Sequence, residues 1–218
     1  NEKGFPVHEC WYENGREHRI GGPSQRSWYD NGILGEEQWK RKTKDKSESF
    51  CHRIGGPAER NWNEMGVLWN ECWLENGENH CANGPAIRNW NSKGILVEEY
   101  WCFRGLIHRE GGPAVSKWNN DGILIEQKWR QDYLFNNLKY VKRYLIRYDD
   151  EDGYYHRIDG PAHQRWNKEG TILLEERWSV NGKLHRIDSP AHLKWNDKGI
   201  LIKEHWAING ICHRELSN

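Results

Sequence analysis

Several common signals are missing from this sequence. Lysine plus arginine equals aspartate plus glutamate, at 32 each, so there is no net charge to draw the chain to nucleic acid or to an anionic membrane. No apolar run approaches the roughly 18 residues of a membrane-spanning helix. No segment keeps a 3.6-residue period, and no Cys-x-x-Cys pair indicates a zinc site. We therefore expect neither helices nor nucleic acid, and no metal or other cofactor.

Tryptophan is the residue that the sequence has in excess. Mean hydropathy is low at −1.04, and only 36% of the residues are hydrophobic. There are nevertheless 14 tryptophans, whereas disordered chains are poor in aromatic residues. We therefore expect the chain to fold around a core dominated by tryptophan.

The tryptophans belong to an internal repeat. A His-Arg pair recurs along the chain, with Cys81 replacing the arginine in one copy; the histidines are His18, His52, His80, His108, His156, His185 and His213. Five residues after the first six histidines stands a proline, and five further on a first tryptophan column: Trp28, Trp62, Trp90, Trp118, Trp166 and Trp195. A second column comprises Trp39, Trp73, Trp101, Trp129, Trp178 and Trp206, with Trp11 as an earlier copy.

This repeat defines one domain over residues 1–218. Its unit, or tile, is about 28 residues long and occurs about six times, with a partial tile at each end. A residue type that is copied in every tile is most simply one that each tile needs in order to stack on the next. An active site, in contrast, is a single constellation. We therefore interpret the repeated His, Arg and Glu residues as structural and do not expect an enzyme.

The pattern inside a tile indicates β-hairpins. Residues 95–101, ILVEEYW, are β-branched and aromatic and follow a polar turn that contains glycine. Asn-Gly pairs at 14–15, 76–77, 181–182 and 209–210 predict a second tight turn in the tiles that contain them. A leucine stands at the start of the second strand in every tile: Leu34, Leu68, Leu96, Leu124, Leu173 and Leu201. The expected fold is all-β, an elongated stack of antiparallel hairpins with tryptophan ladders.

Two registers are open for the hairpins that turn at Asn-Gly. A three-residue loop places Glu204 opposite Arg214, and the same count places Glu176 opposite Arg186. Opposite charges across a strand pair stabilise it by roughly 0.2–1 kcal/mol. A two-residue type I′ turn instead places Glu204 opposite Glu215. We favour the three-residue loop because it pairs charges throughout.

The tile resembles a known repeat. Its motif is W-x-x-N-G-x-x-H-R-x-x-G-P-A, followed by W-x-x-x-G-x-L-x-x-E-x-W, and it covers nearly the whole chain. It is similar to the MORN repeat, in the His-Arg/Gly-Pro-Ala form found in large DNA viruses that infect amoebae, of the Marseillevirus kind. The resemblance implies a non-enzymatic viral scaffold for protein–protein contact, self-association or attachment to membrane lipids. It also implies an intracellular location, in the host cytoplasm or the virion.

Two insertions break the pattern, near 40–49 and 130–149, each after a tryptophan of the second column. Insertions in repeat proteins often lie on the binding face. We therefore predict a basic edge for an acidic partner, made of Lys40, Arg41, Lys42, Lys44, Lys139, Lys142 and Arg143. The alternative is that the insertions form a solvated loop and one extra strand.

The six cysteines occupy no fixed place in the tile. Cys72 and Cys81 flank one hairpin and face each other in the two-residue register, which makes them a candidate disulfide, whereas an intracellular setting favours free thiols. With His80 they are also the one candidate metal set, a weaker interpretation. A different function is a small-ligand or lipid-headgroup module with aromatic cages between tiles, which requires exposed tryptophans.

Overall fold

The computed structural model describes residue 4 and residues 6–42, 49–131 and 154–217. All regular structure in these ranges is β-strand, which confirms the all-β prediction. Contacts divide the chain into two compact units, residues 1–105 and 106–218. Each unit is a run of antiparallel hairpins. Its longer strands follow one another along a sheet in chain order, and most of its shorter strands form separate two-stranded hairpins between them. Each is described by itself, and the prediction of a single repeat domain stays a prediction.

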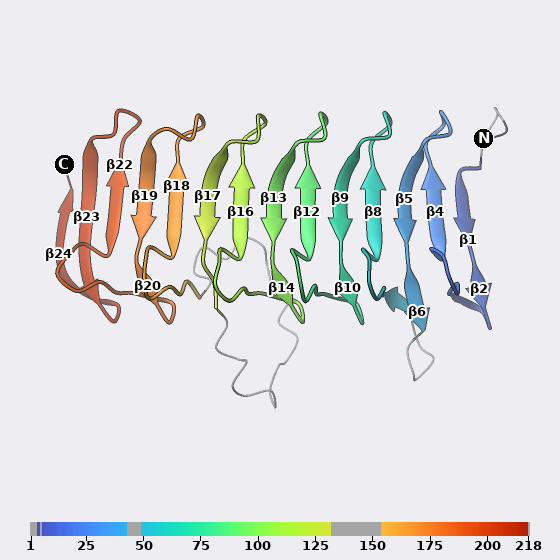
Figure 1. Cartoon of the computed structure of the whole chain (residues 1–218), viewed down its shortest axis with the longest axis horizontal. Helices are drawn as coiled ribbons and strands as arrows, with labels where there is room; N and C mark the ends of the chain where they lie inside the picture. The colour runs from blue at the N-terminus through green and yellow to red at the C-terminus, as the bar shows by residue number, and fades with distance from the viewer. Residues whose placement is uncertain (1–3, 5, 43–48, 132–153, 218) are drawn as a thin grey trace. The chain divides into compact units, whose positions relative to one another are not determined.

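The first unit contains seven longer strands that form a sheet in the order β1-β4-β5-β8-β9-β12-β13 (Figure 1). These strands are β1 (His8–Cys10), β4 (Gln25–Trp28), β5 (Leu34–Gln38), β8 (Glu59–Trp62), β9 (Leu68–Cys72), β12 (Ile87–Trp90) and β13 (Leu96–Tyr100). The shorter strands are β2 (Tyr12–Glu13), β3 (Arg16–Glu17), β6 (Lys40–Lys42), β7 (Ser49–Cys51), β10 (Leu74–Glu75), β11 (Glu78–Asn79) and β14 (Cys102–Phe103).

The second unit repeats this arrangement, with its longer strands in the order β16-β17-β18-β19-β22-β23-β24. These strands are β16 (Val115–Trp118), β17 (Leu124–Lys128), β18 (His163–Trp166), β19 (Leu173–Arg177), β22 (His192–Trp195), β23 (Leu201–Ile208) and β24 (Ile211–Ser217). The shorter strands are β15 (Leu106–Ile107), β20 (Ser179–Val180) and β21 (Lys183–Leu184).

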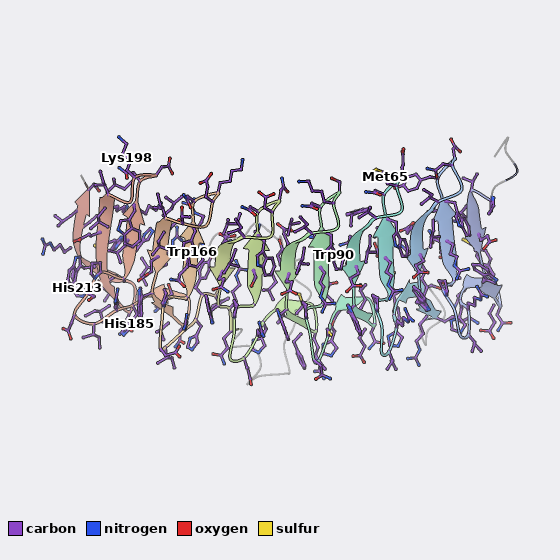
Figure 2. The ribbon with its side chains drawn as sticks, turned by 45° about the horizontal axis from the view of Figure 1, so that its top comes forward. Met65, Trp90, Trp166, His185, Lys198 and His213 are labelled. Carbon is purple, nitrogen blue, oxygen red and sulfur yellow. The ribbon has the colours of Figure 1, made fainter. Side chains whose placement is uncertain are left out.

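Each tile begins with a long hairpin in which the first tryptophan column faces the leucine column. Trp62 pairs with Leu68, and a β-bulge precedes the tryptophan, between Asn61 and Trp62. The polar turn is closed by Asn63, whose Oδ1 accepts hydrogen bonds from two backbone N–H groups, including that of Val67 at 3.0 Å. These turns lie at one end of the strands, and in the second unit Lys198 marks that end (Figure 2).

The second hairpin turns at Asn-Gly in four copies, at residues 14–15, 76–77, 181–182 and 209–210, as the prediction required, and at Arg104-Gly105 in a fifth. These turns lie at the other end of the strands (Figure 1). The favoured three-residue register is wrong. Ile208 pairs directly with Ile211, which leaves a two-residue turn in which Asn209 and Gly210 have φ values of 51° and 83°. Both values are positive, as a type I′ turn needs, and this turn matches the twist of the strands better than a three-residue loop.

A β-bulge that the sequence does not predict shifts the pairing register of the C-terminal hairpin by one more residue. It lies between Trp206 and Ala207, so Glu204 faces Leu216 rather than either charged residue that the two registers offered. Glu176, likewise, does not face Arg186 across a strand pair. Their side chains still meet, at 3.6 Å between Oε1 and Nη1, because the arginine reaches over from the neighbouring turn.

Alanine, and not tryptophan, is the residue most often buried in the core. In the part of the chain that the structure describes, every tryptophan of the two columns is half-buried and none is buried. The alanine after the proline is fully buried in the five tiles that have one: Ala58, Ala86, Ala114, Ala162 and Ala191. The interpretation of a tryptophan-dominated core is therefore wrong, because indoles on a single-layer sheet keep one side open to solvent or to a covering side chain.

These alanines also join neighbouring tiles through their backbone. The carbonyl of Ala58 accepts from the N–H of Trp39 at 2.8 Å, and its N–H donates to the carbonyl of Cys72 at 2.8 Å. Ala191 binds Trp178 and His205 in the same way. Ser24 holds this place in the first tile, is also fully buried and makes the same two backbone bonds, so the repeat keeps a small residue here.

Candidate functional site

The arginine of the His-Arg pair lies flat on a tryptophan of the second column. Arg53 Cζ is 4.0 Å from the centre of the Trp39 indole, and Arg53 Nη1 donates a hydrogen bond to the Pro57 carbonyl at 3.1 Å. Arg157 and Arg186 repeat both contacts, with stacking distances of 4.3 and 3.9 Å. The arginine therefore fixes the Gly-Pro turn onto the sheet and covers the open face of the indole.

In most tiles a glycine stands before the proline and lies close to this guanidinium. A Cβ atom on Gly56 would lie 2.8 Å from Arg53 Cζ, and one on Gly112 would lie 2.8 Å from Arg109 Cζ. A side chain at either glycine would therefore require the guanidinium to shift. Ser189 holds this place before Pro190, and Arg186 still makes both contacts there, so glycine is favoured but not required.

The histidine of the pair connects each tile to the next. His52 Nδ1 accepts a hydrogen bond at 3.0 Å from the backbone N–H of Asn76, in the Asn-Gly turn of the following tile. The same bond recurs at 3.2–3.3 Å in these pairs: His80 with Arg104, His156 with Asn181, and His185 with Asn209. An Nδ1 atom that accepts must be unprotonated, so this contact needs neutral histidine. His18 differs, since its Nδ1 meets the Lys40 carbonyl at 3.1 Å.

The glutamate before the second tryptophan also has an internal use. Glu204 Oε2 accepts the indole N–H of Trp206 at 3.4 Å, and Glu176 accepts that of Trp178. The repeated His and Arg side chains thus hold tiles together, and the Glu side chain binds the tryptophan of its own tile. They do not converge on one point.

The repeat breaks at Trp73, where Cys81 stands in place of arginine. A groove of about 510 Å³ opens there, and Trp73 and Cys81 both line it. The walls come from the preceding Gly-Gly-Pro turn, the Cys81 turn and two charged strands: Arg53, Ile54, Gly55, Glu75, His80, Ala82, Asn83, Gly84 and Arg88. No feature of the sequence other than this one substitution marks the position.

A second feature of the same turns is an exposed isoleucine. It follows His-Arg in these four copies, with exposed fractions of 84, 83, 79 and 65%: Ile20, Ile54, Ile158 and Ile187. The identity of the residue after His-Arg was visible in the sequence, but only the structure shows that it faces solvent. Exposed side chains of this size contribute little to the stability of the fold.

The predicted basic edge is only partly described. Lys40 forms an ion pair with Glu17, and Lys42 Nζ lies 2.7 Å from Glu13 Oε2. Arg41, between them, is exposed. Lys44, Lys139, Lys142 and Arg143 lie outside the described residues, so the edge stays a prediction.

The candidate disulfide is absent, because Cys72 and Cys81 are both free. Cys72 belongs to the long strand β9, where it pairs with Glu59 and Ile87 instead. Burial raises the pKa of the Cys72 thiol to about 12. Among the described residues, no group of three or more His, Cys, Asp and Glu side chains could hold a metal ion.

The strongest cluster of titratable groups surrounds Glu175, which is 5% exposed. His192 Nε2 lies 2.8 Å and Arg177 Nε 2.9 Å from Glu175 Oε1, and Arg165 Nη2 lies 3.3 Å from Oε2. Burial raises the pKa of Glu175, but the hydrogen bond from His192 and the charges of Arg177 and Lys194 outweigh burial and hold the pKa well below its usual range. Every contact of the carboxylate is with the sheet itself, which indicates a structural role.

No family model and no curated protein matches the chain. The similarity to the MORN repeat therefore remains a resemblance of motif. No helix in the described ranges is long and apolar enough to cross a membrane.

Proposed function

We propose that this protein is a non-catalytic scaffold of MORN-like repeats that binds other proteins through the Gly-Pro turns. The observation that carries the proposal is the exposed isoleucine column. Ile20 and Ile54 hold the same place in neighbouring tiles of the first unit, and Ile158 and Ile187 do so in the second. Two strands separate such neighbours, about 10 Å. Exposed apolar groups that gather on one surface are typical of an interaction site, and this column supplies one such group per tile in these copies.

The other repeated side chains support the same proposal, because contacts inside the repeat already use them and leave them unavailable to a partner. Histidine, arginine and glutamate are each used in contacts within or between tiles, as described above for His52, Arg53 and Glu204. The indoles are half-buried, and Trp39, Trp129 and Trp178 are covered by arginine. This arrangement favours protein binding over a module that captures small ligands or lipid headgroups between exposed tryptophans.

The test replaces the isoleucine column with serine in one variant, Ile20→Ser, Ile54→Ser, Ile158→Ser and Ile187→Ser. A matched control carries Met65→Ser and Ile200→Ser, which remove exposed apolar groups (70 and 58% exposed) from the turns at the other end of the strands. Affinity capture from cells that express each protein, read by mass spectrometry, should retain a set of proteins on the wild type and the control. The column variant should lose that set at an unchanged melting temperature.

The proposal is wrong if the column variant and the wild type capture the same proteins. It is equally wrong if, in both cytoplasmic and membrane fractions, the column variant captures every protein that the wild type captures.

A further inference from the structure

The groove beside Trp73 is the place where the repeat lacks its arginine. At Gly56, where arginine is present, a Cβ atom would lie 2.8 Å from the guanidinium, whereas at Gly84 the nearest groups would be 3.6 Å away, namely Cys81 Sγ and Arg88 Nη2. The groove therefore occupies the space that a guanidinium fills in other tiles. Trp73 lines it, where Trp39 in the preceding tile is covered by Arg53.

The chain itself shows what such a space binds. Arg53 uses two groups, the face of Trp39 and the carbonyl of Pro57. The tile of the groove offers their equivalents, Trp73 and the carbonyl of Pro85. In the part of the chain that the structure describes, that carbonyl receives no side-chain donor. An arginine from outside the chain could therefore reproduce both contacts with groups already in place.

The charges around the groove permit a further cation besides Arg53 and Arg88, which both line it. Arg53 is already engaged with Trp39 and the Pro57 carbonyl. Arg88 is neutralised by two carboxylates, with Nη1 2.6 Å from Glu71 Oε1 and Nε 3.7 Å from Glu99 Oε1. Glu75, half-exposed at the rim, adds a carboxylate that faces His80 Nε2 at 3.5 Å.

Two arginines on one indole also have a precedent in the first tile. Arg19 Cζ and Arg26 Cζ lie 4.1 and 5.8 Å from the centre of Trp11. Arg26 holds the place in its tile that Arg88 holds in the tile of the groove, so the guanidinium missing at Trp73 is the counterpart of Arg19.

We propose that the groove at Trp73 binds the guanidinium of an arginine side chain presented by a partner protein. This inference rests on the proposed function and adds the chemistry of one contact. The guanidinium lies on Trp73, donates to the Pro85 carbonyl and faces Glu75. Ile54, 83% exposed on the rim, contacts the apolar part of the partner's chain. Lysine fits less well, because an ammonium group cannot lie flat on the indole and reach the carbonyl at the same time.

The experiment is a titration of the ¹⁵N-labelled full chain with acetyl-Gly-Arg-Gly-amide, followed at the indole N–H signal of Trp73, which Trp73→Phe identifies. We expect a saturable shift at Trp73 and binding about tenfold tighter than that of the Lys analogue. Cys81→Arg should abolish the shift, because its own guanidinium fills the groove, and should raise the melting temperature. Cys81→Ala, which leaves the groove open, should bind the peptide as the wild type does.

These titration results would overturn the inference. They are no shift at Trp73, an equal affinity for the Lys peptide, and a shift that persists in folded Cys81→Arg. If Cys81→Arg captures the same proteins as the wild type in cells, the arginine site is wrong while the isoleucine surface still stands. If sedimentation shows a wild-type dimer that Cys81→Arg dissociates, the occupant is a second copy and not a separate partner.

Discussion

Arg186 lies 3.9 Å from the centre of the Trp178 indole and donates a hydrogen bond to the Pro190 carbonyl at 3.3 Å. One side chain thereby covers a half-buried tryptophan and closes the turn that leads to the next tile. Because Arg53 and Arg157 repeat both contacts, the fold depends on a cation where most cores depend on an apolar residue.

Removing that cation should destabilise the protein. Arg53→Ala loses the stacking on Trp39 and the bond to Pro57, and we expect the free energy of unfolding in urea to fall by about 1–3 kcal/mol. Arg53→Lys should not restore it, because lysine lacks the planar fork. Lys93→Ala, at an exposed position of a polar turn, is the control and should change stability by less than about 0.5 kcal/mol. An effect of Arg53→Ala no larger than that of the control would contradict the role of the arginine.

The histidine contact predicts a dependence on pH. Burial lowers the pKa of His52 below its ordinary 6.5, the charge of Arg41 lowers it further, and Glu75 opposes both. The unfolded chain therefore takes up the proton first, so the contribution of His52 is complete above pH 6.5 and is lost as the pH falls below 6.5.

We expect the melting temperature to fall between about pH 7.5 and 5.5, and to fall less in His52→Ala. An NMR titration should place the His52 midpoint below 6.5. A midpoint at or above that value would mean that Nδ1 does not accept from Asn76.

The Glu175 cluster predicts a loss of stability in acid. Its pKa lies below the ordinary 4.5 because bound cations outweigh burial, so its contribution is complete above pH 4.5 and disappears as the pH falls below that value. Glu175→Gln leaves Arg177 and Arg165 without their carboxylate, and we expect a loss of about 3 kcal/mol at neutral pH. Acid titration of unfolding should then be flatter in the variant. Glu64→Gln, on an exposed turn, is the control; equal losses in the two variants would argue against a buried charge cluster.

The alanine column predicts intolerance to size. Ala162 is fully buried, and its carbonyl accepts from the N–H of Trp129 at 2.7 Å. Ala162→Leu should cost about 1–3 kcal/mol by overpacking, and exchange of the Trp129 amide hydrogen should accelerate. If Leu is accommodated with no change in either quantity, the turn does not pack on the sheet as described.

The sequence was sufficient for the fold and insufficient for the register. Spacing between copies located the tiles, the polar turns and the Asn-Gly hairpins, because glycine and asparagine mark turns directly. The bulge at Ala207 leaves no such mark, since it depends on how β23 and β24 fit together. Counting charges across the hairpin led to the wrong register, because a surface ion pair is worth less than the match between turn and twist.

The candidate binding surface was harder to predict, because it depends on which side chains are exposed to solvent. Composition suggests that tryptophan is buried and gives alanine no special role, yet the single-layer sheet leaves Trp39 half-open and encloses Ala58 completely. The isoleucine after His-Arg could be found as a column, but nothing in its identity says whether it faces water. Cys81 was noted as a variant, and only the neighbouring arginines show that its effect is to open a groove.

We propose that each tile uses some side chains to stack on neighbouring tiles and others to bind a partner protein. Unfolding free energies of His52→Ala, Trp62→Ala and Ile54→Ser, measured together in the full chain, test it most directly. We expect the free energy of unfolding to fall by at least about 1 kcal/mol in His52→Ala and Trp62→Ala, and by less than about 0.5 kcal/mol in Ile54→Ser. A loss at Ile54 as large as that at His52, or no loss at His52 and Trp62, would contradict it.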